Sequence, residues 1–396
     1  MSKIYKYILV TIILFILIIP LTKINNAEKS DEENRQLAKK WELFNENRFN
    51  INFSKEFDAW INDRFRGRTK ILRAYNTCDY FIMGKVDNNM AFKGEDNWLF
   101  YKGDESIINF QNRKLYSDEQ LTKIRDIINM RKKYLKKYGI DYYIMIVPDK
   151  NRVYGEYYPK YIHKLFDYGR GEQLVAYLKE NNIDVIYPLK ELTSAKEVGV
   201  VYYKYDTHWN TYGAFIGYEE MMSFLSMNYN NIDKLEKNDF YVDNIPEYQA
   251  DYLEKKGIID SDKIIGDKGN GDLHRMLYSL TYDENVPSEP ILNMEKKKEY
   301  NFKIVEYKEN LGIGGIHTTN EKASNRMKLL MLRDSFSMAM MPYVAESFSD
   351  VKFIWSQDFN LYFDDIIGSH PDLVIQEIGE RGINCLLQEP NFKEER

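Results

Sequence analysis

Cysteine is nearly absent from this chain of 396 residues, which contains two, Cys78 and Cys385. No Cys-x-x-Cys pair exists, so the sequence excludes a cysteine-based metal or redox framework and allows one disulfide at most. The five histidines include no His-Glu-x-x-His or similar ligand spacing. A phosphate-cradling glycine loop is also missing, because the glycine-rich segment 312–315 has no lysine after it. We therefore predict no metal and no cofactor.

An excess of basic charge is absent as well. Acidic residues number 61 and basic residues 55, which gives a net charge of −6 with the two signs interspersed. Proteins that bind nucleic acid usually gather lysine and arginine on one face, so the composition argues against a nucleic-acid partner. Hydrophobic residues make up 44% of the chain, which is ample for one large or two modest cores. The 32 tyrosines are expected mostly in core and ordinary surface positions rather than in a sugar-stacking platform.

One long apolar run lies at the N-terminus, from residue 7 to residue 21, and follows two lysines. Its length of about 15 residues lies between a signal-peptide core and a bilayer span of about 20 residues. Pro20 ends the run and no small-x-small cleavage pattern follows closely. We therefore expect residues 1–24 to be an uncleaved signal anchor or transmembrane helix, with the body outside the cell membrane. Residues 25–90 are expected to form a stalk and a helical lead-in.

From residue 91 onward, helical and strand patterns alternate. Apolar residues at helical spacing follow the capping signal at 117–120, and the apolar strand at 142–147 ends at Pro148. Further helices are expected at 171–180, 212–227 and 338–346, and further strands at 97–101, 184–187, 328–332, 351–355 and 373–377. This order predicts an α/β fold with a three-layer, doubly wound, mostly parallel sheet. We expect one domain at 91–396 with an insertion at about 230–310.

The parts of a serine-nucleophile acyl-transfer site occur in two motifs, Asp206-Thr207-His208-Trp209-Asn210 and Arg333-Asp334-Ser335-Phe336-Ser337. A serine hydroxyl is a weak nucleophile until a base takes its proton, and a third group must hold that base in the right tautomer. Ser335, His208 and Asp206 can fill these roles. Ser335 also lies between a predicted strand and a predicted helix, whose N-terminal N–H groups suit a developing oxyanion. The alternative is that Ser335 or Asp334 is a plain helix N-cap.

Residues beside these motifs are candidates for substrate binding. Trp209 can wall the site or stack on a sugar ring, although a tryptophan that begins a helix is more often part of a core. Lys150 and Arg333 can hold an acidic polymer or assist by electrostatics, and surface salt bridging is the alternative for both. Glu377 or Glu380 can bring a carboxylate to the site, as in a glycosidase. The sequence places no second acid at the defined separation that glycosidase chemistry needs, so that chemistry ranks lower.

Several short motifs follow one another in a definite order: Glu33-Asn34-Arg35, Asp63-Arg64-Phe65 with Gly67-Arg68, Trp98-Leu99-Phe100, Val147-Pro148-Asp149-Lys150, Asp206-Thr207-His208-Trp209, Gly271-Asp272-Leu273 and Asp334-Ser335-Phe336-Ser337. In this order the chain resembles the SGNH-hydrolase-like domains of the alginate O-acetyltransferase group, AlgX and AlgJ, and the related DHHW proteins. In that family the Asp-x-His-Trp motif precedes the nucleophilic serine, and this sequence shows the same permuted order. The resemblance makes Asp206 the orienting acid, His208 the general base and Ser335 the nucleophile.

The resemblance also implies a function. It implies an extracytoplasmic O-acetyltransferase that passes an acetyl group through a serine acyl-enzyme onto a cell-surface or secreted polysaccharide. A multi-spanning membrane-bound O-acyltransferase would be the partner that supplies the acetyl groups. Two alternatives stay open at this point. One is a glycan acetylesterase that uses the same triad with water as acceptor, and the other is a non-catalytic, membrane-anchored glycan-binding or assembly protein.

Overall fold

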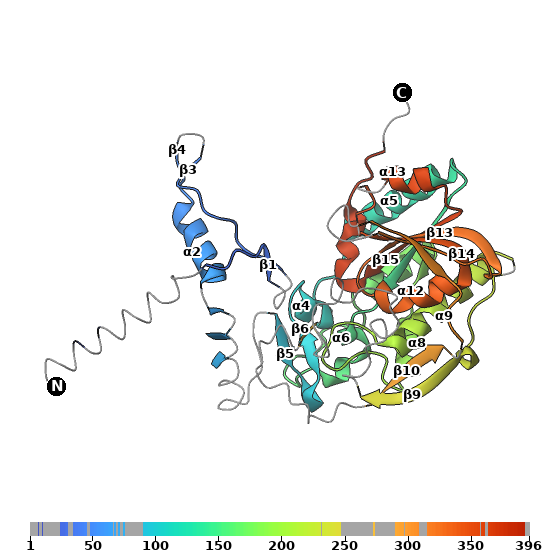
Figure 1. Cartoon of the computed structure of the whole chain (residues 1–396), viewed down its shortest axis with the longest axis horizontal. Helices are drawn as coiled ribbons and strands as arrows, with labels where there is room; N and C mark the ends of the chain where they lie inside the picture. The colour runs from blue at the N-terminus through green and yellow to red at the C-terminus, as the bar shows by residue number, and fades with distance from the viewer. Residues whose placement is uncertain are drawn as a thin grey trace. The chain divides into compact units, whose positions relative to one another are not determined.

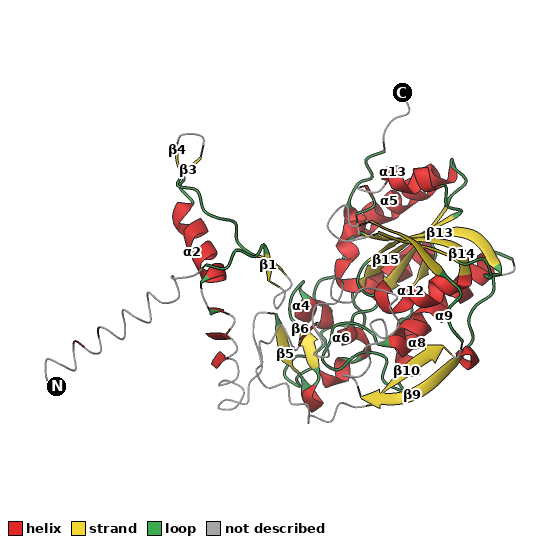
Figure 2. Cartoon of the chain, viewed as in Figure 1, coloured by secondary structure: helices red, strands yellow, loops and turns green. Residues whose placement is uncertain are grey.

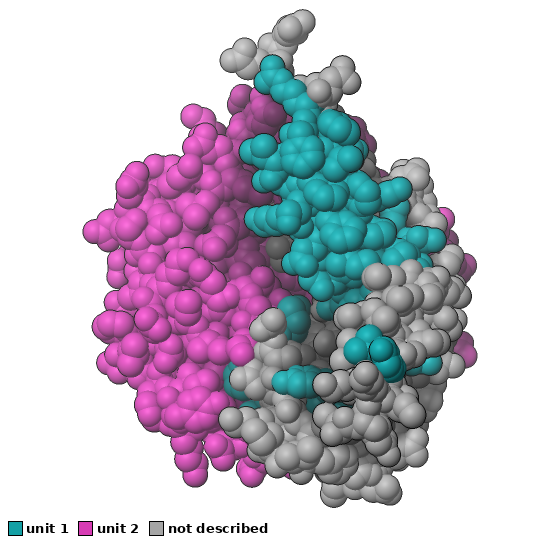
Figure 3. All heavy atoms as spheres, turned by 90° about the vertical axis from the view of Figure 1, so that its left-hand side faces the viewer, with its two compact units in different colours: residues 1–93, 272–286 teal, residues 94–271, 287–396 magenta. Residues whose placement is uncertain are grey.

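The computed structural model describes residues 7, 10, 24–30, 35–45, 48–65, 67–68, 70–71, 74–75, 90–230, 232–246, 272–273, 290–296, 298–308, 315–356, 358–360 and 363–392. The chain divides into two compact units, which Figure 3 colours separately. Unit 1 comprises residues 1–93 and 272–286, and unit 2 comprises residues 94–271 and 287–396. Unit 2 contains the central sheet and the candidate site.

Unit 2 is built on a seven-stranded sheet. Its strands are β7 (Asp141–Val147), β8 (Val185–Ile186), β11 (Lys303–Lys308), β12 (Gly315–Thr319), β13 (Asn325–Arg333), β14 (Phe348–Trp355) and β15 (Leu373–Gly379). They lie in the order β11-β12-β14-β13-β15-β7-β8. Figure 1 labels β13, β14 and β15 of this sheet. The pairs from β14 through β13, β15 and β7 to β8 are parallel, and β11, β12 and β14 pair antiparallel at one edge. The predicted α/β fold with a mostly parallel central sheet is confirmed.

Helices cover both faces of this sheet (Figure 2). On one face, α5 (Asp118–Lys136), α7 (Arg170–Glu180) and α13 (Phe363–Ser369) pack apolar side chains against alternate residues of the central strands, including Ile144, Leu330 and Val374. On the other face, α9 (Thr211–Asn228) and α12 (Ser337–Ser347) pack against each other. All seven residues of β15 are buried. A strand that is buried on both faces has a nearly continuous apolar sequence, as most of β15 does.

Local signals in the sequence explain where the main helices begin. The Ser117 hydroxyl accepts a hydrogen bond of 3.2 Å from the Gln120 N–H, and the Gln120 side chain accepts one of 3.0 Å from the Ser117 N–H. This reciprocal pair is the capping box that the sequence predicts, and it satisfies two N–H groups that lack helical partners. In the same way, the Asn210 side chain accepts a 2.9 Å hydrogen bond from the Gly213 N–H at the start of α9. Asn210 thereby fixes the point at which the Asp206–Asn210 motif enters a helix.

The predicted insertion at about 230–310 contains short strands. Residues 230–310 include β9 (Phe240–Pro246) and β10 (Pro290–Lys296), which pair antiparallel as a separate two-stranded sheet. They also include β11, which extends the main sheet at its antiparallel edge. The segment therefore adds a strand to the main sheet. Its charged, weakly periodic sequence gives little of the alternation by which an edge strand is recognised.

Shorter elements of unit 2 bring loops to the candidate site. They are β6 (Leu99–Tyr101), α4 (Ser106–Phe110), α6 (Lys150–Val153) and α8 (Leu189–Ala195), with 3-10 turns at Glu95–Asn97, Gly155–Tyr157, Lys237–Asp239 and Glu380–Leu387. The strand predicted at 97–101 is thus confined to three residues. The strand predicted at 184–187 is confined to two.

Unit 1 contains α2 (Phe53–Arg64) and the short strand pairs β1 (Lys29–Ser30) with β2 (Arg35–Gln36) and β3 (Phe44–Asn45) with β4 (Arg48–Phe49). The buried Arg64 guanidinium donates hydrogen bonds of 2.8–3.0 Å to the carbonyls of Asn25, Ala27 and Ala38. Asp63 accepts a 2.8 Å hydrogen bond from the Ala38 N–H. The Asp63-Arg64 motif therefore ties the residues after the predicted anchor to α2.

The predicted signal anchor at 1–24 lies almost wholly outside the described residues and stays a prediction. No helix in the described part of the chain combines the length and apolarity that crossing a bilayer requires. The proposed boundaries at residues 24 and 90 likewise stay predictions.

Candidate active site

The acid and the base of the candidate site lie on the loop that leads into α9. Asp206 Oδ1 lies 2.6 Å from His208 Nδ1 and also accepts a 2.9 Å hydrogen bond from the His208 backbone N–H. Because a carboxylate can only accept, this contact requires the proton of the neutral imidazole to be on Nδ1. The other ring nitrogen, Nε2, is then a hydrogen-bond acceptor, which is the state a general base needs.

Ser335 meets that acceptor from the opposite side. Its Oγ lies 2.7 Å from His208 Nε2, although the two residues are 127 positions apart in sequence. Ser335 follows β13, which ends at Arg333, and precedes α12, which begins at Ser337. The Ser335 side chain is half-buried and that of His208 is 25% exposed, so the pair is accessible to a substrate. The structure thus brings Asp206, His208 and Ser335 into one hydrogen-bonded chain.

The turn that carries Ser335 is held by two carboxyl groups. Asp334 accepts hydrogen bonds from the backbone N–H groups of Phe336 (2.8 Å) and Gly379 (2.7 Å). Glu377 of β15 accepts hydrogen bonds from the Asp334 N–H (2.9 Å) and the Ser337 hydroxyl (2.6 Å). The position before the first residue of α12 is occupied by Phe336, with no side-chain cap. The N-cap alternative for Ser335 is therefore not what the structure shows.

Trp209 links the two motifs from within the core. Its side chain is fully buried, and its indole N–H donates a 2.8 Å hydrogen bond to the Phe336 carbonyl. Gly217 of α9 allows this packing, because a Cβ added there would lie 2.7 Å from the indole ring. The observed position fits the core interpretation of Trp209 rather than sugar stacking.

Lys150 and Arg333, the two cations considered for substrate binding, are both buried. The Lys150 ammonium donates hydrogen bonds to the carbonyls of Leu99 (2.8 Å), Lys204 (2.8 Å) and Asp206 (3.0 Å). An ammonium has three protons, so these contacts use all of its donors. The Arg333 guanidinium lies over an aromatic ring of β14 and donates to the Asp334 carbonyl at 3.3 Å. Both side chains are hydrogen-bonded to backbone carbonyls of the loops that carry the site. Polymer binding and surface salt bridging, the two alternatives from the sequence, do not fit these buried positions.

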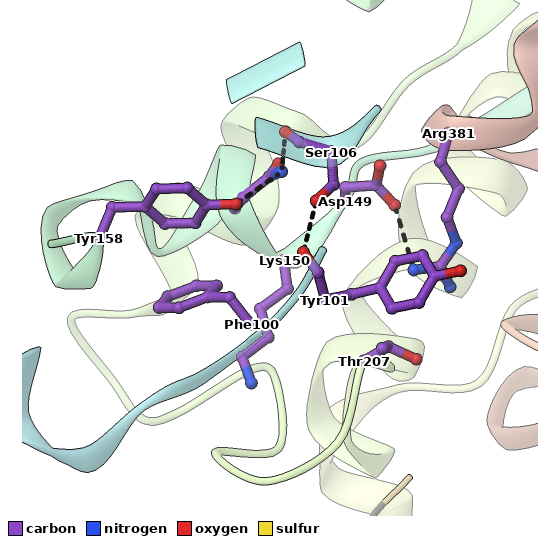
Figure 4. Close-up of a pocket in the computed structure, with 9 residues that line it drawn as sticks. Phe100, Tyr101, Ser106, Asp149, Lys150, Tyr158, Thr207 and Arg381 are labelled. Atoms are coloured by element: carbon purple, nitrogen blue, oxygen red, sulfur yellow. Dashed lines mark hydrogen bonds and ion pairs between the residues drawn. The ribbon is translucent and has the colours of Figure 1, made fainter. Parts of the chain in front are cut away.

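A small cavity beside the loop of His208 is lined by Lys150 and by residues that sequence reasoning did not assign to the site. It holds about 20 Å³, room for about one water molecule. Its lining includes Tyr101, Thr207, Asp149 and Arg381 (Figure 4). The Arg381 guanidinium lies over the rings of Tyr101 (5.4 Å) and Phe336 (5.2 Å). Tyr101 carries no signal in the sequence, whereas Arg381 follows the last strand at the edge where ligands of parallel sheets bind.

Asp149 lines this cavity, and its pKa is far from the ordinary value of an aspartate. Burial raises the pKa of Asp149 to about 7, although the Arg381 guanidinium, 3.8 Å from Oδ1, acts in the opposite direction. The nearby negative charges of Glu380 and Asp334 raise this pKa further. No hydrogen-bond donor in the described part of the chain reaches Asp149 Oδ1. Asp149 therefore titrates near neutral pH behind the loop that carries Asp206.

The sequence profile of the SGNH hydrolase-like domain, acetyltransferase AlgX, matches residues 91–255. Over this range the resemblance to the AlgX family is confirmed. The matched range includes Asp206 and His208, and Ser335 lies beyond it. No curated protein sequence matches the chain.

Solved structures resemble this chain at low sequence identity. Bacillus cereus PatB1 is 17% identical with a TM-score of 0.54, over 76% of this chain and 100% of that chain. The structure of PatB1 with a sulfonyl adduct is 15% identical with a TM-score of 0.53, over 78% and 99%. The O-acetyltransferase domain of Pseudomonas putida AlgJ is 17% identical with a TM-score of 0.47, over 77% and 95%. The likeness to PatB1 shows a shared fold.

Proposed function

We propose that this protein is an extracytoplasmic O-acetyltransferase that moves an acetyl group, through a serine acyl-enzyme, onto a cell-surface or secreted polysaccharide. The observation that carries the proposal is the hydrogen-bonded chain from Asp206 through His208 to Ser335. The match to an SGNH hydrolase-like acetyltransferase profile supports acetyl as the transferred group. The order of the motifs, with the acid and base before the serine, agrees with the permuted order of the family it resembles.

In the first half of the reaction, Ser335 takes the acetyl group. His208 Nε2 removes the Ser335 hydroxyl proton as Oγ attacks the carbonyl carbon of the acetyl donor. Asp206 holds the imidazole in the required tautomer and stabilises the imidazolium that forms. The backbone N–H of Ser335 at the start of the turn is the proposed donor to the oxyanion. When the tetrahedral intermediate collapses, the bond between the carbonyl carbon and the oxygen of the donor's leaving alcohol breaks. His208 then returns the proton to that oxygen.

In the second half, the acetyl group leaves Ser335 for a sugar. His208 Nε2 takes the proton of an acceptor hydroxyl, whose oxygen attacks the acetyl-serine carbonyl. The bond between the carbonyl carbon and Ser335 Oγ breaks, and the proton goes from His208 to Oγ. The serine is regenerated and the product is an O-acetylated glycan.

The proposal extends to location and donor. A signal anchor at residues 1–24 would keep the catalytic body on the outer side of the cell membrane, where a surface glycan is within reach. A membrane-bound O-acyltransferase would deliver the acetyl group from the cytoplasmic side. These two elements rest on the apolar N-terminal run and on the family resemblance, respectively.

Turnover of p-nitrophenyl acetate by the full-length chain in detergent tests the nucleophile. Wild type, Ser335→Ala and His208→Gln are compared with and without a panel of oligosaccharides, and the sugars are examined by mass spectrometry. We expect activity in wild type, none in the two variants, and acetylated sugar as product. Acetate release without sugar acetylation would instead support the acetylesterase alternative. Sugar binding by a catalytically inert wild type would support the non-catalytic one.

His317→Gln is the matched control for the base. His317 Nε2 lies 3.1 Å from Asp350 Oδ1, so the chain contains a second histidine–aspartate contact, between β12 and β14. Loss of activity in His208→Gln with full activity in His317→Gln attributes the effect to the proposed triad. Equal activity in all variants would refute the assignment of Ser335 and His208.

A further inference from the structure

A buried carboxyl group that the proposed chemistry does not use lies against the turn of Ser335. Glu377, on β15, has no exposed surface. Its Oε2 accepts the hydrogen bonds from the Asp334 N–H and the Ser337 hydroxyl, so it contacts the turn on both sides of Ser335. No donor in the described part of the chain reaches its other oxygen, Oε1. An ionised carboxylate in this place would have donors at one oxygen and none at the other, which leaves a buried charge incompletely compensated.

The neighbouring Asp334 has a donor at each of its two oxygens. They accept hydrogen bonds from the Phe336 and Gly379 N–H groups. Beyond the effect of burial, the charge of Asp334 is close enough to Glu377 to raise the pKa of the Glu377 carboxyl. Two carboxyl groups in contact at a buried site cannot both ionise cheaply, so one proton is retained between them.

The other groups around Glu377 come from α12, β7 and β13. Ser337 on α12 contributes a hydroxyl, and Met145 lies opposite Glu377 in the register of β7. Arg333 on β13 directs its guanidinium over an aromatic ring of β14. Burial raises the pKa of Glu377 well above its usual range, and the charge of Asp334 raises it further. These contacts place the retained proton on Glu377.

We propose that Glu377 is a neutral positioning residue that holds the turn of Ser335 through hydrogen bonds to Asp334 and Ser337. The inference rests on the proposed role of Ser335. In its neutral form the Glu377 carboxyl donates to Asp334 and accepts from the Asp334 N–H and the Ser337 hydroxyl. Ionisation of Glu377 removes the donor and sets two negative charges against each other, which loosens the turn and displaces Ser335 Oγ from His208.

An arylsulfonyl fluoride reports the state of the turn without depending on the acetyl donor or the sugar. Ser335 Oγ attacks sulfur, the sulfur–oxygen bond forms, fluoride leaves and His208 takes the serine proton. The experiment measures the rate of Ser335 labelling by mass spectrometry from pH 5 to pH 10, on the full-length chain. The variants are Glu377→Gln, whose amide reproduces the donor and acceptor of a neutral acid, and Glu377→Leu, which has neither.

We expect wild-type labelling to rise as His208 loses its proton and to fall again at alkaline pH as Glu377 ionises. Glu377→Gln should label within about threefold of wild type at neutral pH and should lack the alkaline fall. Glu377→Leu should label about tenfold more slowly, because it leaves the Asp334 N–H and the Ser337 hydroxyl unpaired. Glu346→Gln, a change at a buried glutamate near the other end of α12, should keep the alkaline fall.

Two results would overturn the inference, and they are distinguishable. If Glu377→Gln labels as slowly as Glu377→Leu, or keeps the wild-type alkaline fall, Glu377 does not act as a neutral acid while Ser335 remains the nucleophile. If wild type is not labelled on Ser335 at any pH, the nucleophile assignment fails, and the positioning role fails with it. Recovery of labelling in Glu377→Gln but not in Glu377→Leu supports the hydrogen-bonding role even if Glu377→Leu unfolds at a lower temperature.

Discussion

The ammonium of Lys150 donates a 3.0 Å hydrogen bond to the backbone carbonyl of Asp206. The same ammonium holds the carbonyls of Leu99 and Lys204, and it lies over the rings of Trp98 and Phe100 at 5.0 and 5.4 Å. One buried cation thus joins β6, α6 and the loop of the candidate acid. Its position indicates a role in fixing where the Asp206 carboxylate lies.

The first prediction is that Lys150→Met lowers kcat by about tenfold and leaves KM nearly unchanged. Methionine keeps most of the side-chain length but has no donors, so the loop of Asp206 is released while the substrate surface is intact. The check is a double-mutant cycle with Asp206→Asn, followed by ester turnover. If Lys150 acts through Asp206, the double variant is no slower than Asp206→Asn alone. Additive losses would mean that Lys150 acts on some other feature.

The second prediction concerns Trp209→Phe, which removes the hydrogen bond from the indole to the Phe336 carbonyl but keeps an aromatic ring. We expect a loss of about 1–3 kcal/mol in the free energy of unfolding and a decrease in kcat of about three- to tenfold. Trp98→Phe is the matched control, since Trp98 is equally buried and its indole N–H has no partner in the described part of the chain. Denaturant titrations and turnover are measured on both. A smaller effect at Trp209 than at Trp98 contradicts the prediction.

Asp149→Asn tests the pKa shift of the cavity. In the unfolded chain an aspartate titrates near about 4, and in the folded protein Asp149 titrates at about 7. Between these values the folded state holds a proton that the unfolded state has released, so this group makes stability fall as pH rises through that window. Asparagine cannot ionise, so the melting temperature of Asp149→Asn relative to wild type should increase from pH 5 to pH 8. A difference that stays constant with pH would show that Asp149 is not shifted.

Arg131 provides a prediction for the opposite face of the sheet. Its buried guanidinium donates to the Gln376 side chain at 3.2 Å and to the Gln388 carbonyl at 3.0 Å. Arg131→Met should reduce the free energy of unfolding by about 2–3 kcal/mol, because the Gln388 carbonyl loses its donor and the Gln376 side chain keeps only the Tyr142 hydroxyl as a donor. The folded variant should keep its kcat, since Gln376 and Glu377 point to opposite faces of β15. Denaturant titration measures the loss, and an unchanged free energy of unfolding in Arg131→Met would contradict these pairings.

The sequence was sufficient for the elements whose signals are local. The capping box at Ser117 predicts the start of α5, and the apolar runs predict β7 and β15, because each pattern is set within a few residues. The chain from Asp206 through His208 to Ser335 was also predicted, since the chemistry requires these residue types and the motif order indicates their roles.

What the sequence did not reveal depends on contacts between distant segments. Nothing beside Lys150 in the sequence shows that its ammonium is enclosed by three carbonyls, so it was interpreted as a surface or substrate-facing cation. Glu377 was considered as a catalytic acid, whereas the structure places it against the turn of Ser335. Tyr101 and Arg381 are far apart in the sequence, and the fold brings them together. For such residues, the fold decides the partners and hence the role.

The strand order has a consequence for how the protein folds during synthesis. β7 and β8 come early in unit 2 and β11 to β14 come much later, and β15 joins these two sets of strands by pairing with both β7 and β13. β15 is the last strand of the sheet in sequence, so a ribosome must finish residues 373–379 before the two sets can become one sheet. Until then the buried edges of β7 and β13 are exposed and prone to misassociation. Termination before β15 would therefore yield an aggregating chain rather than a shortened enzyme.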